Sequence, residues 1–286
     1  MTYKKWSLNG GIRWDDNQLR VEDRFFIDGN ASDKRNLTAW SPQVGLSFQL
    51  KPRLVVYGNY SQSYETPTLS ELSADPNNRG GFNDLVNIQE AQNNEVGLKY
   101  IGTQTQWNLV YFSINTKNDL VPYELAAAPG RTFFQNAGTT VRNGVEIDLS
   151  HKFNDKFTFS LSYSQTDFTY RKYVSNGQRL DGNKLPGIPS SFGNISIDYL
   201  FNNKAQLNYE RVYRGELFAQ DSNTTSIAGF WRDDISYKIP FKLATRTGHI
   251  ILGSTNLFNV KYSDNIRINA FGGRFYEAAP MRSLYA

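Results

Sequence analysis

The chain has 286 residues, of which 39% are hydrophobic and 14% aromatic, and it contains no cysteine. No apolar run approaches the ~20 residues of a membrane-spanning helix, and neither disulfides nor thiolate metal sites can form without cysteine. The 31 Lys and Arg residues exceed the 27 Asp and Glu residues by 4, and they are spread along the chain rather than gathered in the basic patch of a nucleic-acid-binding protein. Composition thus excludes helical membrane proteins and disulfide scaffolds and argues against a nucleic-acid partner, but it leaves β-barrels open, because their strands alternate in hydropathy.

The first predicted strand runs from Lys5 to about Asp15 and alternates apolar with polar side chains. Trp6 and Trp14 share one face and lie roughly 26 Å apart at about 3.3 Å per residue. In a tilted strand this separation matches the apolar band between the two aromatic girdles of a membrane barrel. We therefore assign a set of aromatic residues to the girdles: Trp6, Trp14, Trp107, Tyr100 and Tyr237.

After a polar loop from Asp16 to Arg35, the chain forms a long predicted hairpin that turns at Lys51-Pro52. Each arm runs about 10 residues, which is long for a soluble sheet and suits a tilted bilayer crossing. Its alternation predicts one apolar and one polar face. We predict that the apolar residues Val44, Leu46, Phe48, Ile195, Ile197 and Leu207 point outward, and that the polar residues Gln43, Ser47, Ser196, Asp198 and Gln206 point inward.

The same rhythm continues to the end of the chain. Further strands are predicted near residues 94–101, 106–115, 145–150, 157–164, 195–199, 205–209, 235–239, 250–252 and 274–286. Short turns are predicted at 102–104, 154–155, 202–203 and 240–246, and long loops lie between them, including one that reaches Gly138. About 12 strands are thus joined by short and long connections in strict alternation, as when one rim of a barrel faces the periplasm and the other faces outward.

These patterns predict an all-β protein, an antiparallel up-and-down transmembrane β-barrel formed by residues 1–286 as a single region. A soluble β-sandwich is the alternative, but it has no reason to sort its loops by length between two rims.

Histidine and cysteine, two residue types that commonly carry out catalysis or bind metals, are rare or absent in the sequence. His151 and His249 share no spacing with each other or with a carboxylate cluster, so a metal or catalytic site is not expected. The glycine pairs at 80–81 and 272–273 do not follow a strand–helix phosphate pattern. The sequence therefore predicts neither an enzyme nor a cofactor.

The long loops carry arginines and aromatic residues, which suit anionic or aryl ligands such as metal chelates. The candidate substrate-binding residues are Arg79, Tyr123, Arg131, Phe133, Tyr170, Arg171, Arg179 and Arg214. The alternative is that these arginines pair with nearby acids such as Asp167 or Glu216.

Four stretches of the sequence resemble one family in order and spacing. They are Ser41–Leu50 with Val56–Leu72, then Asn94–Tyr100, then Asn136-Ala137-Gly138 with Arg142–Glu146, and last Thr255–Asn259 with Tyr262. Together they resemble the barrel of TonB-dependent outer-membrane receptors. The resemblance covers essentially the whole chain and corresponds to the later part of that barrel.

The resemblance implies a barrel of about 22 strands, an N-terminal plug, binding of an iron chelate such as a ferric siderophore, and import driven by the TonB energy-coupling complex. It also implies an outer-membrane location and contact with outer-membrane lipid. Residues 1–10 carry no apolar signal-peptide stretch, and neither plug nor early strands are recognisable, so we expect a segment of a receptor that forms an open, strongly curved sheet. A passive porin-like channel and a structural outer-membrane barrel are the alternatives.

Overall fold

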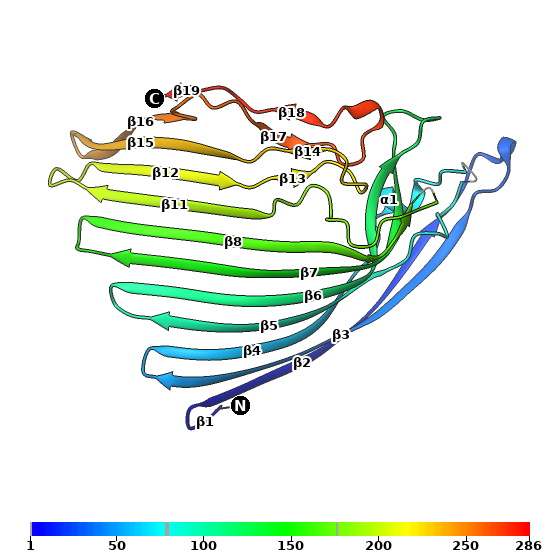
Figure 1. Cartoon of the computed structure of the whole chain (residues 1–286), viewed down its shortest axis with the longest axis horizontal. Coiled ribbons are helices and arrows are strands. Elements are labelled where there is room, and N and C mark those ends of the chain that lie inside the picture. Colours follow the sequence, from blue (N-terminus) through cyan, green and yellow to red (C-terminus); the bar gives the residue numbers. More distant parts are fainter. Residues whose placement is uncertain (1, 78–79, 176) are drawn as a thin grey trace.

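The computed structural model describes residues 2–77, 80–175 and 177–286, which form one strongly curved antiparallel sheet (Figure 1). Its strands, in spatial and chain order, are β1 (Thr2–Tyr3), β2 (Trp6–Val21), β3 (Asp33–Lys51), β4 (Leu54–Glu65), β5 (Gln89–Ile101), β6 (Thr105–Glu124), β7 (Thr132–Lys152), β8 (Phe157–Lys172), β11 (Ser191–Leu200), β12 (Gln206–Arg214), β15 (Phe230–Leu243), β16 (Arg246–Thr255) and β19 (Ser283–Tyr285). The prediction of an all-β antiparallel sheet of about 12 long strands is confirmed, and β1 is a two-residue addition.

Smaller elements occupy the long connections. They are η1 (Phe26–Asp28), α1 (Leu69–Ser73), η2 (Phe271–Gly273) and the two-stranded pairs β9 (Val174–Ser175) with β10 (Gln178–Arg179), β13 (Leu217–Phe218) with β14 (Ser226–Ile227), and β17 (Ser263–Ile266) with β18 (Tyr276–Ala278). In the described part of the chain, no helix has the length and apolar character needed to cross a membrane.

The connections are sorted by length between the two ends of the sheet, as predicted. Short turns fall at residues 52–53, 102–104, 153–156, 201–205 and 244–245, on the left in Figure 1. The long connections at 22–32, 66–88, 125–131, 173–190 and 215–229 gather at the right-hand end, and the connection at 256–282 reaches that end and returns to β19 on the left. We call these the turn end and the loop end.

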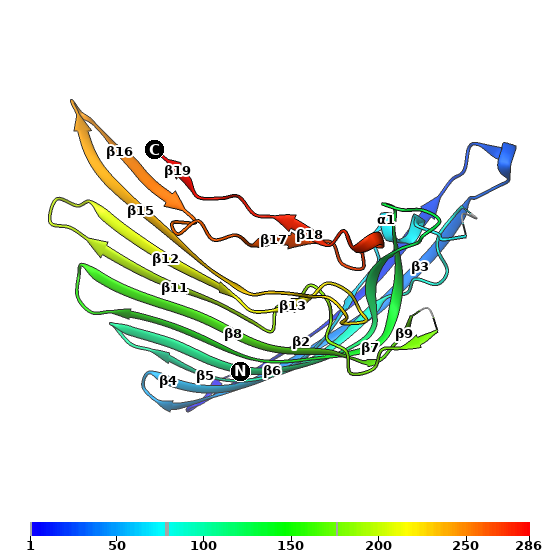
Figure 2. The ribbon, with the colours of Figure 1, turned by 45° about the horizontal axis from the view of Figure 1, so that its top comes forward.

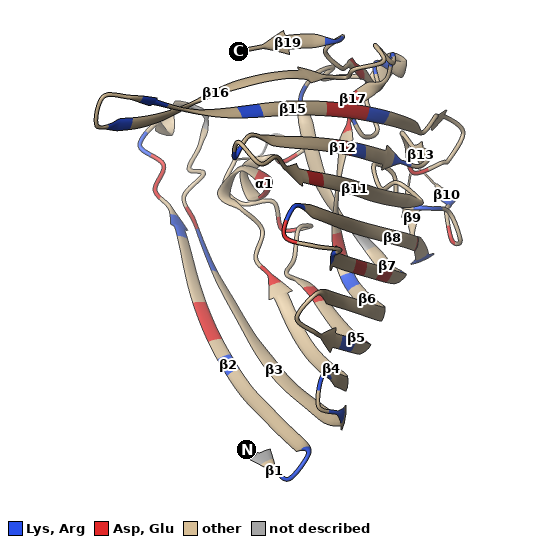
Figure 3. Cartoon of the chain, turned by 90° about the vertical axis from the view of Figure 1, so that its left-hand side faces the viewer, with Lys and Arg blue, Asp and Glu red and all other residues tan. Residues whose placement is uncertain are grey.

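The two faces of the sheet differ as the alternation predicted. Leu8 pairs with Leu46 and Trp14 with Trp40, and Leu46 remains 46% exposed although it lies in mid-strand. On the other face, Asn9 and Asn59 flank Gly45 so closely that a Cβ there would lie 2.6 and 2.5 Å from their Oδ1 atoms. Leu19, which has the parity of Asn9, packs against the connection that carries α1, and α1 lies inside the arc of strands (Figure 3). The polar face is therefore the concave one.

The later hairpins obey the same rule. Ile197 pairs with Tyr209 and Tyr199 with Leu207, while Ser196 pairs with Glu210 and Asp198 with Asn208. The predicted division into apolar outward and polar inward residues is confirmed by this register.

The strands extend further toward the loop end than predicted. The loop expected from Asp16 to Arg35 is confined to 22–32, and the one expected to reach Gly138 is confined to 125–131, because β6 and β7 pair from Asp119–Ala137 up to Glu124–Thr132. A ladder depends on backbone hydrogen bonds alone, so it continues in water after the apolar alternation has ended. At the turn end, the turn expected at 240–246 is likewise confined to 244–245. The ladder continues through Pro240, which pairs with His249, because a proline removes only one hydrogen-bond donor from its strand.

The prediction of a final strand over 274–286 is wrong in extent. Residues 276–278 pair with β17 instead, and only Ser283–Tyr285 join the main sheet, opposite Gly253–Thr255. Pro280 lies between the two pieces, and its missing N–H and fixed φ separate them.

The sheet is open. The β1–β2 hairpin and β19 stand at opposite ends of the strand order, and no ladder joins them within the described residues (Figures 1 and 2). The expectation of an open, strongly curved sheet is confirmed.

Four of the five predicted girdle residues lie near the turn end, and Trp14 lies nearer the loop end. Trp6 contacts Phe48 with ring centroids 4.5 Å apart, and Tyr100 stacks on Trp107 at 6.0 Å, both near the turn end. Tyr237 contacts Phe201 at the same end, at 5.7 Å. Trp14 lies 6.2 Å from Trp40, nearer the loop end. Two aromatic rows are what a bilayer-spanning sheet requires, and the contact of these rings with lipid stays a prediction.

Candidate functional site

A cavity of about 530 Å³ opens at the loop end of the sheet. Four segments line it: the tip of the β6–β7 hairpin, the β9–β10 pair, the connection between β13 and β14, and residues 269–271. The lining combines the rings of Tyr123 and Phe271 with the amides of Gln178, Gln220 and Asn269 and the carboxylates of Glu124 and Asp221. We call this the rim cavity. Its mixture of ring faces and hydrogen-bonding groups is typical of a small-ligand site.

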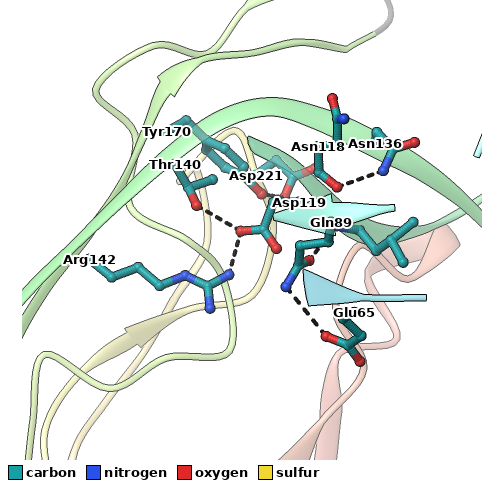
Figure 4. A network of polar contacts seen from close by, with 10 residues as sticks. Glu65, Gln89, Asn118, Asp119, Asn136, Thr140, Arg142, Tyr170 and Asp221 are labelled. Carbon is teal, nitrogen blue, oxygen red and sulfur yellow. Dashed lines mark hydrogen bonds and ion pairs between the residues drawn. The ribbon is translucent and has the colours of Figure 1, made fainter. Parts of the chain in front are cut away.

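Asp221 is a wall of the rim cavity and also a hub of hydrogen bonds. Its Oδ1 accepts from the Tyr170 hydroxyl at 2.6 Å, and its Oδ2 accepts from the Asn269 side-chain amide at 3.0 Å and the Tyr173 hydroxyl at 3.3 Å. Its backbone N–H donates to Asn269 Oδ1 at 3.0 Å, and its carbonyl accepts from the Asn183 amide at 2.8 Å. Figure 4 shows the tyrosine approaching the carboxylate. One side chain thus connects three of the long connections.

The Asp221 carboxylate is 7% exposed and makes no ion pair within the described residues. Burial raises its pKa, although the hydrogen bonds from Tyr170, Asn269 and Tyr173 act in the opposite direction. Burial, together with the Asp221 charge, also raises the pKa of the Tyr173 hydroxyl to about 12. The hydroxyl therefore remains a donor at neutral pH.

Two small hydrophobic clusters fix the segments around Asp221. One consists of Val121, Tyr170, Tyr173, Leu180 and Leu185, and the other of Leu217, Ala219, Ile227, Ala270 and Phe275. Backbone hydrogen bonds from Gly187 to Phe218 (2.8 Å) and from Asn269 to Ala219 (3.0 Å) join the connections directly. The loops on this side are therefore a packed unit with a core of its own.

Glu124 occupies the opposite wall of the cavity. Its Oε2 accepts from the backbone N–H of Gly130 at 3.1 Å and of Phe271 at 3.4 Å, and it lies 3.7 Å from Arg274 Nη2. These contacts tie the tip of the β6–β7 hairpin to η2. Glu124 is thus partly neutralised, whereas Asp221 is not.

A second unit of the mouth is built on the connection that carries α1. Thr68 and Glu71 form a capping box, which begins α1. Asp33 Oδ2 accepts from the Phe82 N–H at 2.9 Å, and Arg35 donates to the Asn83 carbonyl at 3.1 Å. Leu72, Phe82 and Val86 form its buried core, packed against Leu19, Val21, Leu120 and Phe134. This connection therefore spans from β2 and β3 to β6 and β7.

Between the two units lies a polar row on β6 and β7 (Figure 4). Asp119 accepts from the Thr140 hydroxyl at 2.8 Å and forms an ion pair with Arg142. Asn136 donates to the Asn118 carbonyl at 2.6 Å and to the Asn87 carbonyl at 3.1 Å. These contacts link β6 and β7 through their side chains, whereas the buried Arg142 Nε has no hydrogen-bond partner among the described residues.

The predicted ligand residues are distributed unequally around the rim. Tyr123 lines the rim cavity, and its ring lies 5.9 Å from that of Phe133. Arg131 stacks on Phe133 at 4.9 Å, and both Arg131 and Arg171 are exposed and make no ion pair within the described residues. Arg79 lies outside the described residues.

The other candidates have structural partners. Phe133 and Tyr170 are buried, Arg179 pairs with Asp181 at 2.7 Å, and Arg214 is buried over the Phe230 ring with its guanidinium bonded to the Ser263 carbonyl at 2.8 Å. Lys184, rather than an arginine, pairs with Asp167. Whether any of these residues contacts a ligand stays a prediction.

Sequence reasoning missed Glu124, Asp221 and Asn269. The sequence offers one signal, because asparagine favours turns, and both Asn223 and Asn269 adopt a positive φ of 55° in the structure. Nothing in the sequence pattern brings Asp221 to Tyr170, because Tyr170 lies at the end of β8 and Asp221 lies in the connection between β13 and β14.

The described residues contain no group of three or more potential metal ligands from His, Asp or Glu. His151 lies at the turn end, where its Nδ1 is 2.8 Å from the Thr105 hydroxyl.

An open antiparallel sheet with an apolar convex face, a polar concave face and a ligand-sized cavity among its long loops defines the class of outer-membrane β-barrels. The family described as "TonB dependent receptor-like, beta-barrel" matches residues 1–269, and the chain belongs to this family. The family comprises outer-membrane transporters rather than enzymes, in agreement with the sequence-based predictions of location and of no catalysis.

Among curated proteins, the chain is 23% identical over 242 residues to the "Probable TonB-dependent siderophore receptor PiuA" of Acinetobacter baumannii, covering 80% of this chain and 32% of that protein. The chain thus spans about a third of the curated relative's length.

Solved structures of similar fold include the siderophore receptor PiuA from Acinetobacter baumannii, with a TM-score of 0.74 and 20% identity over 98% of this chain and 40% of that one. The ferric citrate transporter FecA in its unliganded form has a TM-score of 0.78 and 19% identity, and the match covers 99% of this chain and 42% of that one. The copper transporter OprC has a TM-score of 0.79 and 18% identity, and the match covers 99% of this chain and 44% of that one. At these identities the likeness establishes the shared fold.

Proposed function

We propose that this chain forms the ligand-binding rim of a TonB-dependent receptor that imports a scarce nutrient as a metal chelate, a ferric siderophore or another iron chelate. The observation that carries the proposal is the rim cavity of about 530 Å³ in a chain of this family. Its volume falls within the ~300–1,000 Å³ of small-ligand sites. The similarity to a curated relative named as a probable siderophore receptor supports the choice of ligand class.

The chemistry of the rim suits an aryl chelate. Tyr123 and Phe271 offer ring faces, the amides of Gln178 and Gln220 offer donors and acceptors, and Arg131 adds an exposed cation beside the cavity. A ferric tris-catechol chelate presents flat rings and net negative charge, which ring faces and a guanidinium attract. In this proposal, outer-membrane lipid covers the apolar face, and the TonB complex supplies energy through a plug domain outside this chain.

Uptake and binding by the complete gene product, expressed in the outer membrane, test the proposal. Cells that carry the gene should accumulate iron supplied as the ferric tris-catechol chelate, and a Tyr123→Ala variant should accumulate less. The exposed Tyr60, on the apolar face, provides the control Tyr60→Ala. Iron uptake that is identical with and without the gene would overturn the proposal.

A passive channel and a structural barrel make different predictions in the same experiment. Uptake through a passive channel persists when the TonB complex is deleted and does not saturate with ligand concentration. A structural barrel supports no uptake, but its loss weakens the cell envelope. The proposed receptor requires saturable uptake that is abolished by deletion of the TonB complex.

A further inference from the structure

The position of Asp221 is unusual because this buried residue both lines the rim cavity and accepts hydrogen bonds from neighbouring segments. It forms part of the rim cavity, together with Gln220 and Ser222. Its oxygens meanwhile accept hydrogen bonds from Tyr170 at the end of β8, from Tyr173 just beyond it, and from Asn269 in the connection between β17 and β18. Any movement of the β13–β14 connection away from the cavity must break these bonds.

The hydrogen bonds of Asp221 are opposed by its burial. The carboxylate has no cationic partner within the described residues, so neutral donors alone compensate for its loss of water. Burial raises its pKa, which shows that the donors do not fully offset the desolvation. The connection is also held by apolar packing, because Leu217, Ala219 and Ile227 share a buried cluster with Ala270 and Phe275.

Glycines lie at both attachments of the connection that Asp221 holds. β13 and β14 contribute two residues each to their ladder. Glycines flank them: Gly215 precedes β13, and Gly229 follows β14, where its missing side chain leaves room for the carbonyl oxygen of Arg214 at 2.5 Å from an ideal Cβ. This short ladder is thus separated from β12 and from β15 by a segment that contains a glycine.

We propose that Asp221 is a positioning residue that latches the β13–β14 connection against Tyr170, Tyr173 and Asn269, so that release of this latch opens the rim cavity and ligand in the cavity keeps the latch closed. The ligand-dependent half of this inference rests on the proposed function, whereas the latch itself is a property of the chain. A ligand that fills the cavity excludes water from the exposed edge of Asp221 and stabilises the closed state by mass action.

The absence of cysteine from the chain provides a direct assay. Ala219 is fully buried beside Asp221 in the cluster with Leu217 and Phe275, so a cysteine at Ala219→Cys reacts with a maleimide only when the connection opens. Ala74, which is also buried but belongs to the connection that carries α1, provides the matched reporter Ala74→Cys. Both reporters are measured in the complete gene product in outer-membrane vesicles, with any cysteine outside this chain replaced by serine.

Asp221→Asn should accelerate labelling at Ala219→Cys about tenfold, because its amide donates where the carboxylate accepted. Tyr170→Phe, which removes one donor and keeps the ring, should accelerate it by a smaller factor of about threefold. The exposed Asp84 provides the control Asp84→Asn, which should leave both rates unchanged. Ala74→Cys should be insensitive to all three substitutions.

Ligand dependence is measured with the ferric tris-catechol chelate as the probe. Saturating chelate should slow labelling of Ala219→Cys at least fivefold, and Asp221→Asn should remove most of this protection. A purely structural role for Asp221 would alter labelling without altering the protection by the chelate, and that result would overturn the inference.

The two proposals fail in distinguishable ways. Chelate that does not bind, together with faster labelling in Asp221→Asn, refutes the proposed function and leaves the latch standing. Chelate that binds, together with equal labelling in Asp221→Asn and the unsubstituted chain, refutes the latch. If Asp221→Asn fails to assemble, Tyr170→Phe decides between these outcomes, since it changes a single hydroxyl.

Discussion

The Tyr170 hydroxyl lies 2.6 Å from Asp221 Oδ1 and joins positions 51 residues apart in the chain. Both residues are almost fully buried, although Tyr170 lies at the loop end of β8 and Asp221 lies in the connection between β13 and β14. Loops of this length would otherwise be mobile. Their order depends on two hydrophobic clusters and on a few buried polar contacts, and the first prediction concerns the protonation of one of these polar groups.

Opening of the β13–β14 connection should depend on pH. Burial raises the pKa of Asp221 above the ~3.9 of an exposed aspartate, so the closed state binds the proton more tightly than the open one. The extra stability that protonated Asp221 gives to the closed state is therefore present in full below about pH 4 and is lost as the pH rises through the raised pKa. Labelling of Ala219→Cys, corrected for thiolate fraction, should accelerate over this interval.

The control for this pH dependence is Asp221→Asn, which should make the corrected labelling rate flat with pH. Tyr170 and Tyr173 face the carboxylate, and the pKa of Tyr173 is about 12, so this hydroxyl does not titrate in the same interval. Asp119, beside Tyr170, and Glu124, across the cavity, are the other nearby acids. A pH profile that survives in Asp221→Asn would assign the effect to one of them.

The two faces of the sheet predict opposite tolerance to charge. Leu46→Arg places a cation on the apolar face, where it should destabilise the membrane-inserted form by about 2–4 kcal/mol if the site is near the midplane. Ser47→Arg lies one residue away, on the concave face, and should cost less. Denaturant titration of the refolded protein in lipid measures both, and equal costs would contradict the assignment of the faces.

Replacing one partner of the Asp119–Arg142 ion pair should destabilise the protein more than replacing both partners. Arg142→Met leaves the buried Asp119 carboxylate with only the Thr140 hydroxyl and should destabilise the protein by about 3–5 kcal/mol. The double variant Asp119→Asn with Arg142→Met carries no unpaired charge and should recover much of this loss. Thermal unfolding of the three proteins in detergent gives the comparison, and an additive double variant would refute the coupling.

Tyr123 should contribute to affinity through its ring. Its loss in Tyr123→Ala removes an aromatic face from the rim cavity, and an aromatic contact is worth about 0.5–1.5 kcal/mol, which corresponds to at most roughly a tenfold weaker Kd. Tyr123→Phe should retain most of the affinity. Fluorescence titration with the ferric tris-catechol chelate checks both, and equal affinity in Tyr123→Ala would place the ligand elsewhere on the rim.

The sequence predicts the main sheet better than it predicts the rim. Trp6, Trp14 and Leu46 could be assigned to the apolar face, because a period of two is a local property of the chain. The extension of β6 and β7 beyond the apolar band could not be predicted, since only backbone pairing maintains it. The contact of Asp221 with Tyr170 and Asn269 was also beyond reach, because loop packing brings together residues that no local pattern relates.

The β6–β7 hairpin carries both units of the mouth. Leu120 and Phe134 pack against the connection with α1, while Val121 packs in the Tyr170 cluster and the Pro122 carbonyl accepts from Asn269 at 3.0 Å. The β6–β7 hairpin thus supports both units of the mouth, which pack against it from opposite sides. Each unit has its own buried core. One unit can therefore diverge in sequence or move while the other keeps its position, provided that the hairpin between them is preserved.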